Sequence, residues 1–310
     1  MTPRLARILR IATILAVAIG LWFFVKKIDW GKLGDHLATA KIWPLVLAAV
    51  VNFVLLVGKA VCWRIMLAPR HHVSTLRLTR YTIVAFSASV LAPARAGELL
   101  RVWLLKKRDG VPTADVAAVA IAEKLLDGVT ILVFVAPLPW LLPDLPAWVT
   151  DSILICAGVA FAAFVGLFIA VGRVKDPKSW FARFIAGMHV LRSGRRLIGA
   201  MAALWIVWVA DLLMIWLVAY AVGIDLSIPA GLLVLFTLNL AITAPSTPAS
   251  VGALEVGVLA GTKLLGIPDE PAFALALLYH VLQIVPLVIV GLSLEWRLVL
   301  GKDGRDLAAT

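Results

Sequence analysis

The stretch DSILICAGVAFAAFVGLFIAVG, residues 151–172, decides the fold class, because no residue after its first aspartate carries a charge. A helix of about 20 apolar residues is long enough to cross the roughly 30 Å hydrocarbon core of a bilayer. Further apolar runs occupy residues 8–25, 42–62, 78–92, 116–141, 199–222, 228–244, 252–267 and 271–294. Together they predict an all-α, polytopic membrane helical bundle with about seven to nine apolar segments.

The composition excludes a soluble enzyme. Hydrophobic residues make up 62% of the 310 residues and charged residues 15%, and the mean hydropathy is +1.00. Soluble domains carry about a quarter charged residues, so a soluble core would not absorb this many apolar side chains. The net charge of +11 does not indicate a nucleic-acid partner, because the basic residues lie in short segments between apolar runs. Such residues set membrane topology and contact anionic headgroups.

The positions of Lys and Arg predict a single transmembrane domain over residues 1–310 with both termini in the cytoplasm, in the cell inner membrane. The cytoplasmic segments are expected at 95–108, about 173–198 and 297–310. The first apolar run resembles a signal peptide, but it continues to Val25, which favours an uncleaved first helix.

The run 78–92 has two interpretations. If both of its basic flanks face the cytoplasm, it enters and leaves the membrane by the same face, as a re-entrant hairpin. If it spans the membrane, the N-terminus lies outside. The first interpretation is favoured, and it predicts re-entrant or broken helices around 78–98 and, at a second and uncharged break, around 244–256.

The two breaks contain similar residue types. The first, residues 92–98, reads APARAGE, and the second, residues 244–255, reads APSTPASVGALE. Pro removes a backbone donor and Gly permits unusual φ, so each break can expose N–H groups that bind an anion. Thr247 followed by Pro248 suits an N-cap and first helical turn. Interrupted segments in corresponding places of two halves indicate a transporter site; the alternative is two unrelated loops rich in turn residues.

Ionisable side chains within the apolar runs are the candidate site residues, since each costs about 3 kcal/mol inside a membrane. Glu123 and Asp127 share a helix face, and Glu98 and Arg101 are spaced to pair on the helix after the first break. The alternative is an interfacial helix end, where charge costs little. The candidate substrate-binding residues are Pro93, Arg95, Gly97, Glu98, Arg101, Glu123, Lys124, Asp127, Asn239, Pro245, Pro248, Gly252, Glu255 and His280.

No sequence motif indicates a cofactor, a metal site or a catalytic residue. The stretch 257–263 looks like a phosphate loop, but its glycine spacing is one residue short. Two glycines spaced in this way between apolar residues indicate close helix packing instead. Cys62 and Cys156 lie in or near apolar runs, as small buried residues do.

At residues 92–127 and 244–291 the chain resembles the transmembrane (flippase-type) domain of the lysylphosphatidylglycerol synthase family. Ser250 stands where that family is often richer in Gly, Lys124 where it prefers Arg, and His280 at a place where an Arg is common. The motifs that carry the resemblance are Pro93-x-Arg95-x-Gly97-Glu98-x-x-Arg101, Glu123-Lys124-x-x-Asp127, and Pro245-x-x-Pro248 through Gly252 to Glu255.

The resemblance covers about residues 5–300 and implies lipid translocation. In two-domain relatives a soluble C-terminal domain makes the aminoacylated lipid. Since this chain stops at Thr310, it resembles a stand-alone member, and aminoacyl transfer is expected to be absent. The implied partners are membrane lipids with a phospholipid or polyprenyl-linked headgroup, and a lipid-modifying enzyme.

Three functions are open at this point. The first is a lipid flippase or headgroup transporter, which would run downhill or be ion-coupled because the chain has no ATP motif. The second is a membrane-embedded enzyme on a lipid-linked substrate, with a carboxylate as base. The third is a non-catalytic partner of a lipid-modifying enzyme.

Overall fold

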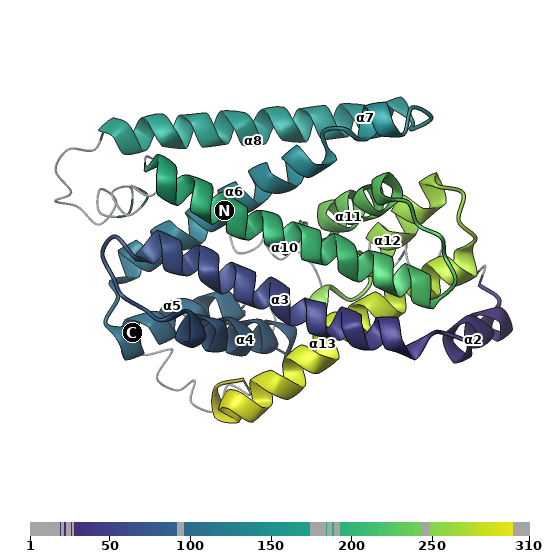
Figure 1. Ribbon diagram of the computed structural model, residues 1–310, viewed down its shortest axis with the longest axis horizontal. Helices are drawn as coiled ribbons and strands as arrows, with labels where there is room; N and C mark the ends of the chain where they lie inside the picture. The colour runs from purple at the N-terminus through teal and green to yellow at the C-terminus, as the bar shows by residue number, and fades with distance from the viewer. Residues whose placement is uncertain are drawn as a thin grey trace. The chain divides into compact units, whose positions relative to one another are not determined.

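The computed structural model describes residues 28–91, 96–173, 193–243 and 248–299, with Ile19, Trp22, Lys26, Phe184 and Met188 as isolated positions. All regular structure within these residues is helical (Figure 1), which confirms the predicted all-α fold. Most of the run 8–25, most of the basic segment 173–198 and nearly all of the tail 297–310 lie outside the described residues. So do the loop residues 92–95 and 244–247.

Every apolar run within the described residues forms a helix, with bounds a few residues from those predicted. Among these residues four helices are long and apolar enough to cross a membrane: α3, α8 (as Ala147–Ile169), α10 and α13 (as Asp269–Arg297). The elements are α2 (Trp30–Ala38), α3 (Ile42–Leu67), α4 (Thr75–Leu91), α5 (Ala96–Asp109), α6 (Thr113–Val135), α7 (Leu138–Leu141), α8 (Ala147–Arg173), α10 (Gly194–Ala221), α11 (Ile228–Thr243), η2 (Pro248–Ser250), α12 (Ala253–Leu264) and α13 (Asp269–Val299).

Helix α8 shows the surface of a membrane protein most clearly. Its side chains are almost all apolar, yet Ile155, Val159 and Phe161 are each more than 60% exposed. A continuous apolar helix face of this kind would aggregate in water. In a bilayer it faces lipid tails, which are themselves apolar.

Helices α4 and α5 form the first hairpin. Arg77, near the start of α4, donates to Asp109, the last residue of α5, over 2.6 Å, so the two helices run antiparallel and lie side by side (Figure 1). At about 1.5 Å per residue each is shorter than the bilayer core. This confirms the broken helices predicted around 78–98. A Cβ on Gly97 would come within 1.7 Å of the Ala85 carbonyl oxygen, so only glycine allows this approach.

Helices α11 and α12 form the second hairpin and also lie side by side (Figure 1). A Cβ on Gly257 would lie 2.6 Å from Leu238 Cα, and one on Gly261 would lie 2.9 Å from Val234 Cα. These contacts confirm that the glycines of the stretch 257–263 serve close helix packing. They also show that the helices run antiparallel, because the higher residue number in α12 meets the lower one in α11.

The turn that enters α12 contains Pro248, predicted to open a helical turn after an N-cap at Thr247, which lies outside the described residues. Pro248 begins the short helix η2, and α12 begins only at Ala253, after Gly252. The cause is the backbone between them: Ala249 and Ser250 have φ of 57° and 59°, and Gly252 has φ of 87°. Left-handed residues cannot continue a right-handed helix, so the α-helical ladder starts after them.

The order of helices occurs twice along the chain. A long helix, a hairpin of two shorter helices and another long helix appear as α3 to α6 and again as α10 to α13. Glu98 and Glu255 are both the third residue of the second hairpin helix. The separation between Glu98 and Glu123 in the sequence equals that between Glu255 and His280. These correspondences favour an internal repeat over two unrelated loops.

The chain divides into two compact units. Unit 1 contains residues 1–52, 140–145 and 211–286, and unit 2 contains residues 53–139, 146–210 and 287–310. The core of unit 2 is built from apolar side chains of α3, α4, α5, α6 and α10. Unit 1 buries Met214 of α10, Leu233 of α11, Leu259 of α12 and Tyr279 of α13.

In unit 1 a side-chain amide supplies a hydrogen bond that a proline removes from the backbone of helix α13. Pro286 lies inside α13 and has no N–H to donate to the carbonyl of Leu282, four residues earlier. The buried Asn52 amide of α3 donates instead, over 3.2 Å to the Leu282 oxygen and over 3.1 Å to the Gln283 oxygen. This is a structural task, of the kind that lone polar side chains in membrane helices often perform between helices.

Candidate functional site

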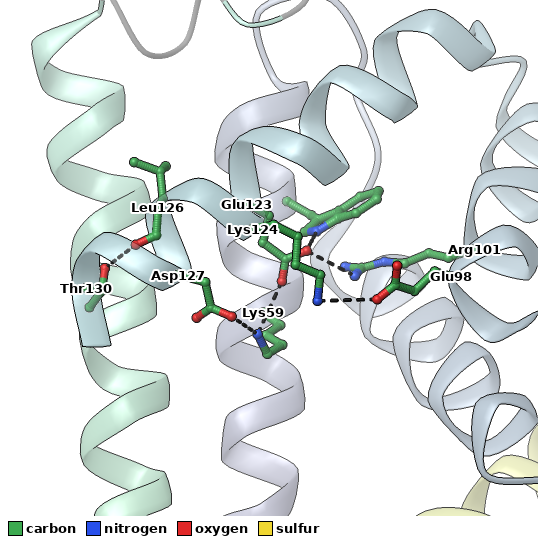
Figure 2. Close-up of polar contacts among 9 residues, drawn as sticks. Lys59, Glu98, Arg101, Glu123, Lys124, Leu126, Asp127 and Thr130 are labelled. Carbon is green, nitrogen blue, oxygen red and sulfur yellow. Dashed lines mark hydrogen bonds and ion pairs between the residues drawn. The ribbon is translucent and has the colours of Figure 1, made fainter. Parts of the chain in front are cut away.

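A buried ion cluster in unit 2 is built around Lys59 of α3. Its ammonium lies 3.3 Å from Glu123 Oε1 and 3.0 Å from Asp127 Oδ2, both on α6 (Figure 2). The two carboxylates reach one cation because they are one helical turn apart on the same face, as predicted. Lys59 itself is absent from the predicted set, although a lysine inside an apolar run is the signal that identifies it.

The second carboxylate oxygen of Glu123 is held by an aromatic and a cationic side chain. Trp63, one turn after Lys59 on α3, donates its indole N–H to Glu123 Oε2 over 2.6 Å. Arg101 of α5 stacks on the Trp63 ring with its guanidinium carbon 3.5 Å from the ring centroid. Its Nη1 lies 3.8 Å from Glu123 Oε2. Side chains from three helices, α3, α5 and α6, therefore meet at the Glu123 carboxylate.

The charges of this cluster sum to zero, but several of its polar atoms have no hydrogen-bond partner. Lys59 and Arg101 supply two positive charges, and Glu123 and Asp127 supply two negative ones. Among the described residues, Arg101 Nε, Arg101 Nη2 and Asp127 Oδ1 are buried without a hydrogen-bond partner. Unpaired buried donors of a cation are costly in a low-dielectric medium. The cluster therefore has unused capacity to bind an anion at Arg101.

A second ion pair lies beside the cluster and corrects one prediction. Lys124 Nζ contacts Glu98 Oε1 over 3.3 Å, and both side chains are about half exposed (Figure 2). Glu98 and Arg101, expected to pair on α5, each pair with a residue of α6 instead. The interhelical partners win because Arg101 is buried against Trp63 and Glu123, whereas Glu98 is exposed.

A pocket opens next to these side chains, entirely within unit 2. Its empty volume is about 410 Å³, counting the part open to solvent. The polar lining consists of Ser89, Glu98, Arg101, Glu123 and Lys124, and the remaining lining residues are Trp63, Ala85, Phe86, Gly97 and Ala120.

The helix N-termini after the two breaks are less open to an anion than the sequence suggests. The Gly97 N–H at the start of α5 donates to Ser89 Oγ over 3.1 Å. The Gly252 N–H before α12 donates to Glu255 Oε2 over 2.6 Å. Side chains of the protein thus already use one N–H in each hairpin.

The other predicted residues gather in unit 1, around α12 and α13. Glu255 Oε1 lies 2.6 Å from His280 Nδ1, and His280 Nε2 lies 2.9 Å from the Ala249 carbonyl oxygen. Asn239 does not join them: its amide donates to the Leu235 carbonyl of its own helix over 2.8 Å. Pro93, Arg95 and Pro245 lie outside the described residues.

A third group of ionised residues lies at the ends of the α4–α5 hairpin. Glu295 Oε1 accepts from Arg80 over 2.8 Å and from Arg108 over 2.7 Å. The hydrogen bond to Glu295 raises the pKa of Arg108. Pairs this exposed are worth little, about 0–1 kcal/mol each. Within the described ranges no group of His, Cys, Asp and Glu has the arrangement of a metal site.

The family follows from a comparison with known protein families. Residues 8–291 match the family described as the lysylphosphatidylglycerol synthase TM region. The chain belongs to this family. No curated protein matches the chain in sequence. Membership in the lysylphosphatidylglycerol synthase TM region family identifies a membrane protein related to lipid metabolism, and no catalytic domain is evident in the matched region.

Proposed function

We propose that the chain binds the headgroup of a membrane lipid in the unit 2 pocket and translocates the lipid across the bilayer. One observation carries the proposal: Arg101 lines the pocket, and two of its guanidinium nitrogens, Nε and Nη2, are buried with no partner among the described residues. A planar guanidinium fork matches the oxygens of a phosphate. A lipid phosphate is thus the ligand whose chemistry best completes the cluster.

The charges around the pocket support a zwitterionic or anionic headgroup. The Lys124–Glu98 pair is half exposed, so opening it costs only about 0–1 kcal/mol. Once open, Lys124 is free to join Arg101 on a phosphate, and Glu98 to contact an ammonium group. The four charges of the cluster stay balanced in this exchange. A zwitterionic headgroup compensates both Lys124 and Glu98, whereas an anionic headgroup leaves Glu98 to the solvent that it already faces.

The size of the pocket supports binding of the headgroup alone. The enclosed part of the pocket is small, so it suits at most a headgroup, while the lipid tails remain in the bilayer. The pocket would replace water around a group that otherwise pays a large desolvation penalty in hydrocarbon. The helix interruptions in corresponding places of the two repeats also favour a transporter.

The proposal includes a location and a driving force. We place the protein in the inner membrane with the segment 173–198 and both termini in the cytoplasm, as the Lys and Arg distribution predicts. With no nucleotide motif in the sequence, translocation runs down a lipid gradient or is coupled to an ion. Glu123 is poorly suited to act as the base of an enzyme, since both of its oxygens are already engaged.

Purified protein reconstituted into vesicles with a fluorescent phospholipid tests the proposal, with a quencher that reaches only the outer leaflet. Wild-type protein should make the inner-leaflet lipid accessible, and Arg101→Gln should slow this at least tenfold. Arg101→Lys should recover part of the rate, because a charge without the fork remains. The matched control is Lys106→Gln, which removes an exposed cation from the same helix as Arg101.

Two results would contradict the proposal. The first is a wild-type protein that moves no lipid with a phosphate, amine or sugar headgroup. The second is an Arg101→Gln variant that is folded and moves lipid at the wild-type rate. Mass spectrometry of the recovered lipid separates the alternative, since an enzyme changes the mass of its substrate and a translocase does not.

A further inference from the structure

The pair Glu255 and His280 in unit 1 has a geometry that the proposed function does not use. Both side chains are buried, with 9% of the Glu255 side chain and 7% of the His280 side chain exposed. The imidazole lies between two acceptors, the Glu255 carboxylate at 2.6 Å from Nδ1 and the Ala249 carbonyl at 2.9 Å from Nε2. A carbonyl oxygen only accepts, so Nε2 donates its hydrogen to Ala249.

Counting hydrogens fixes how many protons the pair holds. With Nε2 donating to Ala249, the short contact at Nδ1 needs one more hydrogen, either on the imidazole or on the carboxyl group. In both arrangements the pair holds one proton and has no net charge. When this proton leaves, a carboxylate faces a neutral imidazole, and one negative charge remains buried.

The same two side chains hold a strained turn. Ala249 and Ser250 adopt left-handed φ of 57° and 59°, which side chains other than glycine disfavour. His280 binds the turn at the Ala249 carbonyl, and Glu255 binds it at the Gly252 N–H, over 2.6 Å. The turn is thereby fixed at both ends by one hydrogen-bonded pair.

Loss of the proton would release one of these ends. A neutral imidazole has a single N–H, and a carboxylate is a stronger acceptor than a carbonyl. His280 would then donate to Glu255 and leave Ala249 without a donor. Strain at the two left-handed residues favours their relaxation once the contact is gone.

Other charged groups near the pair have partners or lie apart from it. On α13, the Tyr279 hydroxyl donates to Asp211 of α10 and accepts from Gln283. Helix α11 contains no ionisable side chain. On α12, Lys263 is exposed and lies about 12 Å along the helix from Glu255. From α3, the amide of Asn52 contacts only backbone oxygens of α13.

We infer that the Glu255–His280 pair is a proton-binding site, and that its proton holds the turn at residues 249–252 in the observed conformation. The ligand is the proton itself, bound at lower pH and lost as the pH rises. The inference does not depend on lipid translocation. It concerns unit 1 alone, and the quantity that tests it is the conformation of the turn at residues 249–252.

Hydrogen exchange of the folded protein between pH 6 and 9, corrected for intrinsic rates, tests the inference. In wild-type protein the amides of 249–252 should lose at least tenfold protection as the pH rises, while those of α10 stay protected. His280→Arg should keep the turn protected throughout, because a guanidinium donates to both acceptors without titrating. His36→Arg, on α2, is the matched control and should behave as wild type.

Protection of the wild-type turn that does not change with pH would overturn the inference. So would a His280→Arg turn that still loses protection as wild type does. If His280→Arg does not fold, nitrogen NMR on a variant with His280 as its only histidine replaces it. A His280 signal that stays constant between pH 5 and 9 overturns the proton site, and a signal that titrates while the turn stays protected overturns its coupling to the turn.

Discussion

The two hairpins have the same local design but different polar partners for the carboxylates on their second helices and on the helices that follow. Each follows a long helix, contains a break with proline, packs closely through a glycine and places a carboxylate at the third residue of its second helix. In unit 2 the helix after the hairpin supplies Glu123 to a cluster with Lys59 and Arg101. At the corresponding place in unit 1 stands His280, opposite Glu255.

This difference separates two kinds of polar site. Lysine, arginine and carboxylates keep their charges near neutral pH, so the unit 2 cluster is a set of fixed charges suited to holding a charged ligand. Histidine is the side chain whose charge changes near neutral pH, so the unit 1 pair is suited to gaining and losing a proton. In our two proposals, one repeated framework carries a lipid-binding site in one copy and a proton-binding pair in the other.

The largest expected effect on stability comes from removing one charge of the cluster around Lys59. Lys59→Met removes a cation from the buried Glu123 and the partly buried Asp127. Removal of one partner of a buried ion pair costs about 3–5 kcal/mol. Thermal unfolding in detergent should show a large loss of stability. Lys106→Met, which removes an exposed lysine of α5, is the control and should change little.

A double variant sharpens this test. Lys59→Met with Asp127→Leu removes one charge of each sign and leaves Arg101 with Glu123. It should recover much of the lost stability, because the remaining charges balance again. A double variant less stable than Lys59→Met alone would show that packing around Lys59, and not charge balance, determines the stability of the cluster.

The glycine contacts should give the next largest effect, and they compare the hairpins directly. Gly97→Ala should destabilise the protein by about 1–3 kcal/mol or more, since its Cβ would meet a backbone oxygen at 1.7 Å. Gly257→Ala should cost less, because its nearest atom would lie at 2.6 Å. Gly128→Ala on α6, with open space around it, is the control. Equal melting temperatures for all three would contradict the close packing of both hairpins.

The smallest change in stability is expected at the half-exposed pair beside the pocket. Glu98→Gln should alter the free energy of unfolding by less than about 1 kcal/mol. In the vesicle assay it should slow lipids with an ammonium headgroup more than purely anionic ones, because only the former lose a contact. Identical rates for both lipid classes would show that Glu98 takes no part in headgroup recognition. The role proposed for Arg101 would not be affected by that result.

The sequence patterns predict the helices, but they predict only part of the pairing between charged side chains. Length and hydropathy locate the apolar helices, because the bilayer imposes both. They miss α2, which is short and begins at the N-cap Asp29. The pairing of Glu98 with Arg101 was wrong since sequence spacing describes one helix, whereas the actual partners come from α6.

Lys59 illustrates the same limit. Its position inside an apolar run marks it as exceptional, but its partners Glu123 and Asp127 lie more than sixty residues away. A single sequence contains no information on which helices meet. The spacing of Glu123 and Asp127, by contrast, is local, and their shared face was predicted correctly.

The contact between Asn52 and the α13 backbone near Pro286 has an evolutionary consequence. The proline creates a bare carbonyl at Leu282, and the asparagine covers it, so each residue makes the other tolerable. Replacing Asn52 alone leaves the Leu282 carbonyl without a donor, and replacing Pro286 alone supplies a backbone N–H that competes with the Asn52 amide for that carbonyl. Among homologous chains, substitutions at positions 52 and 286 should therefore occur together.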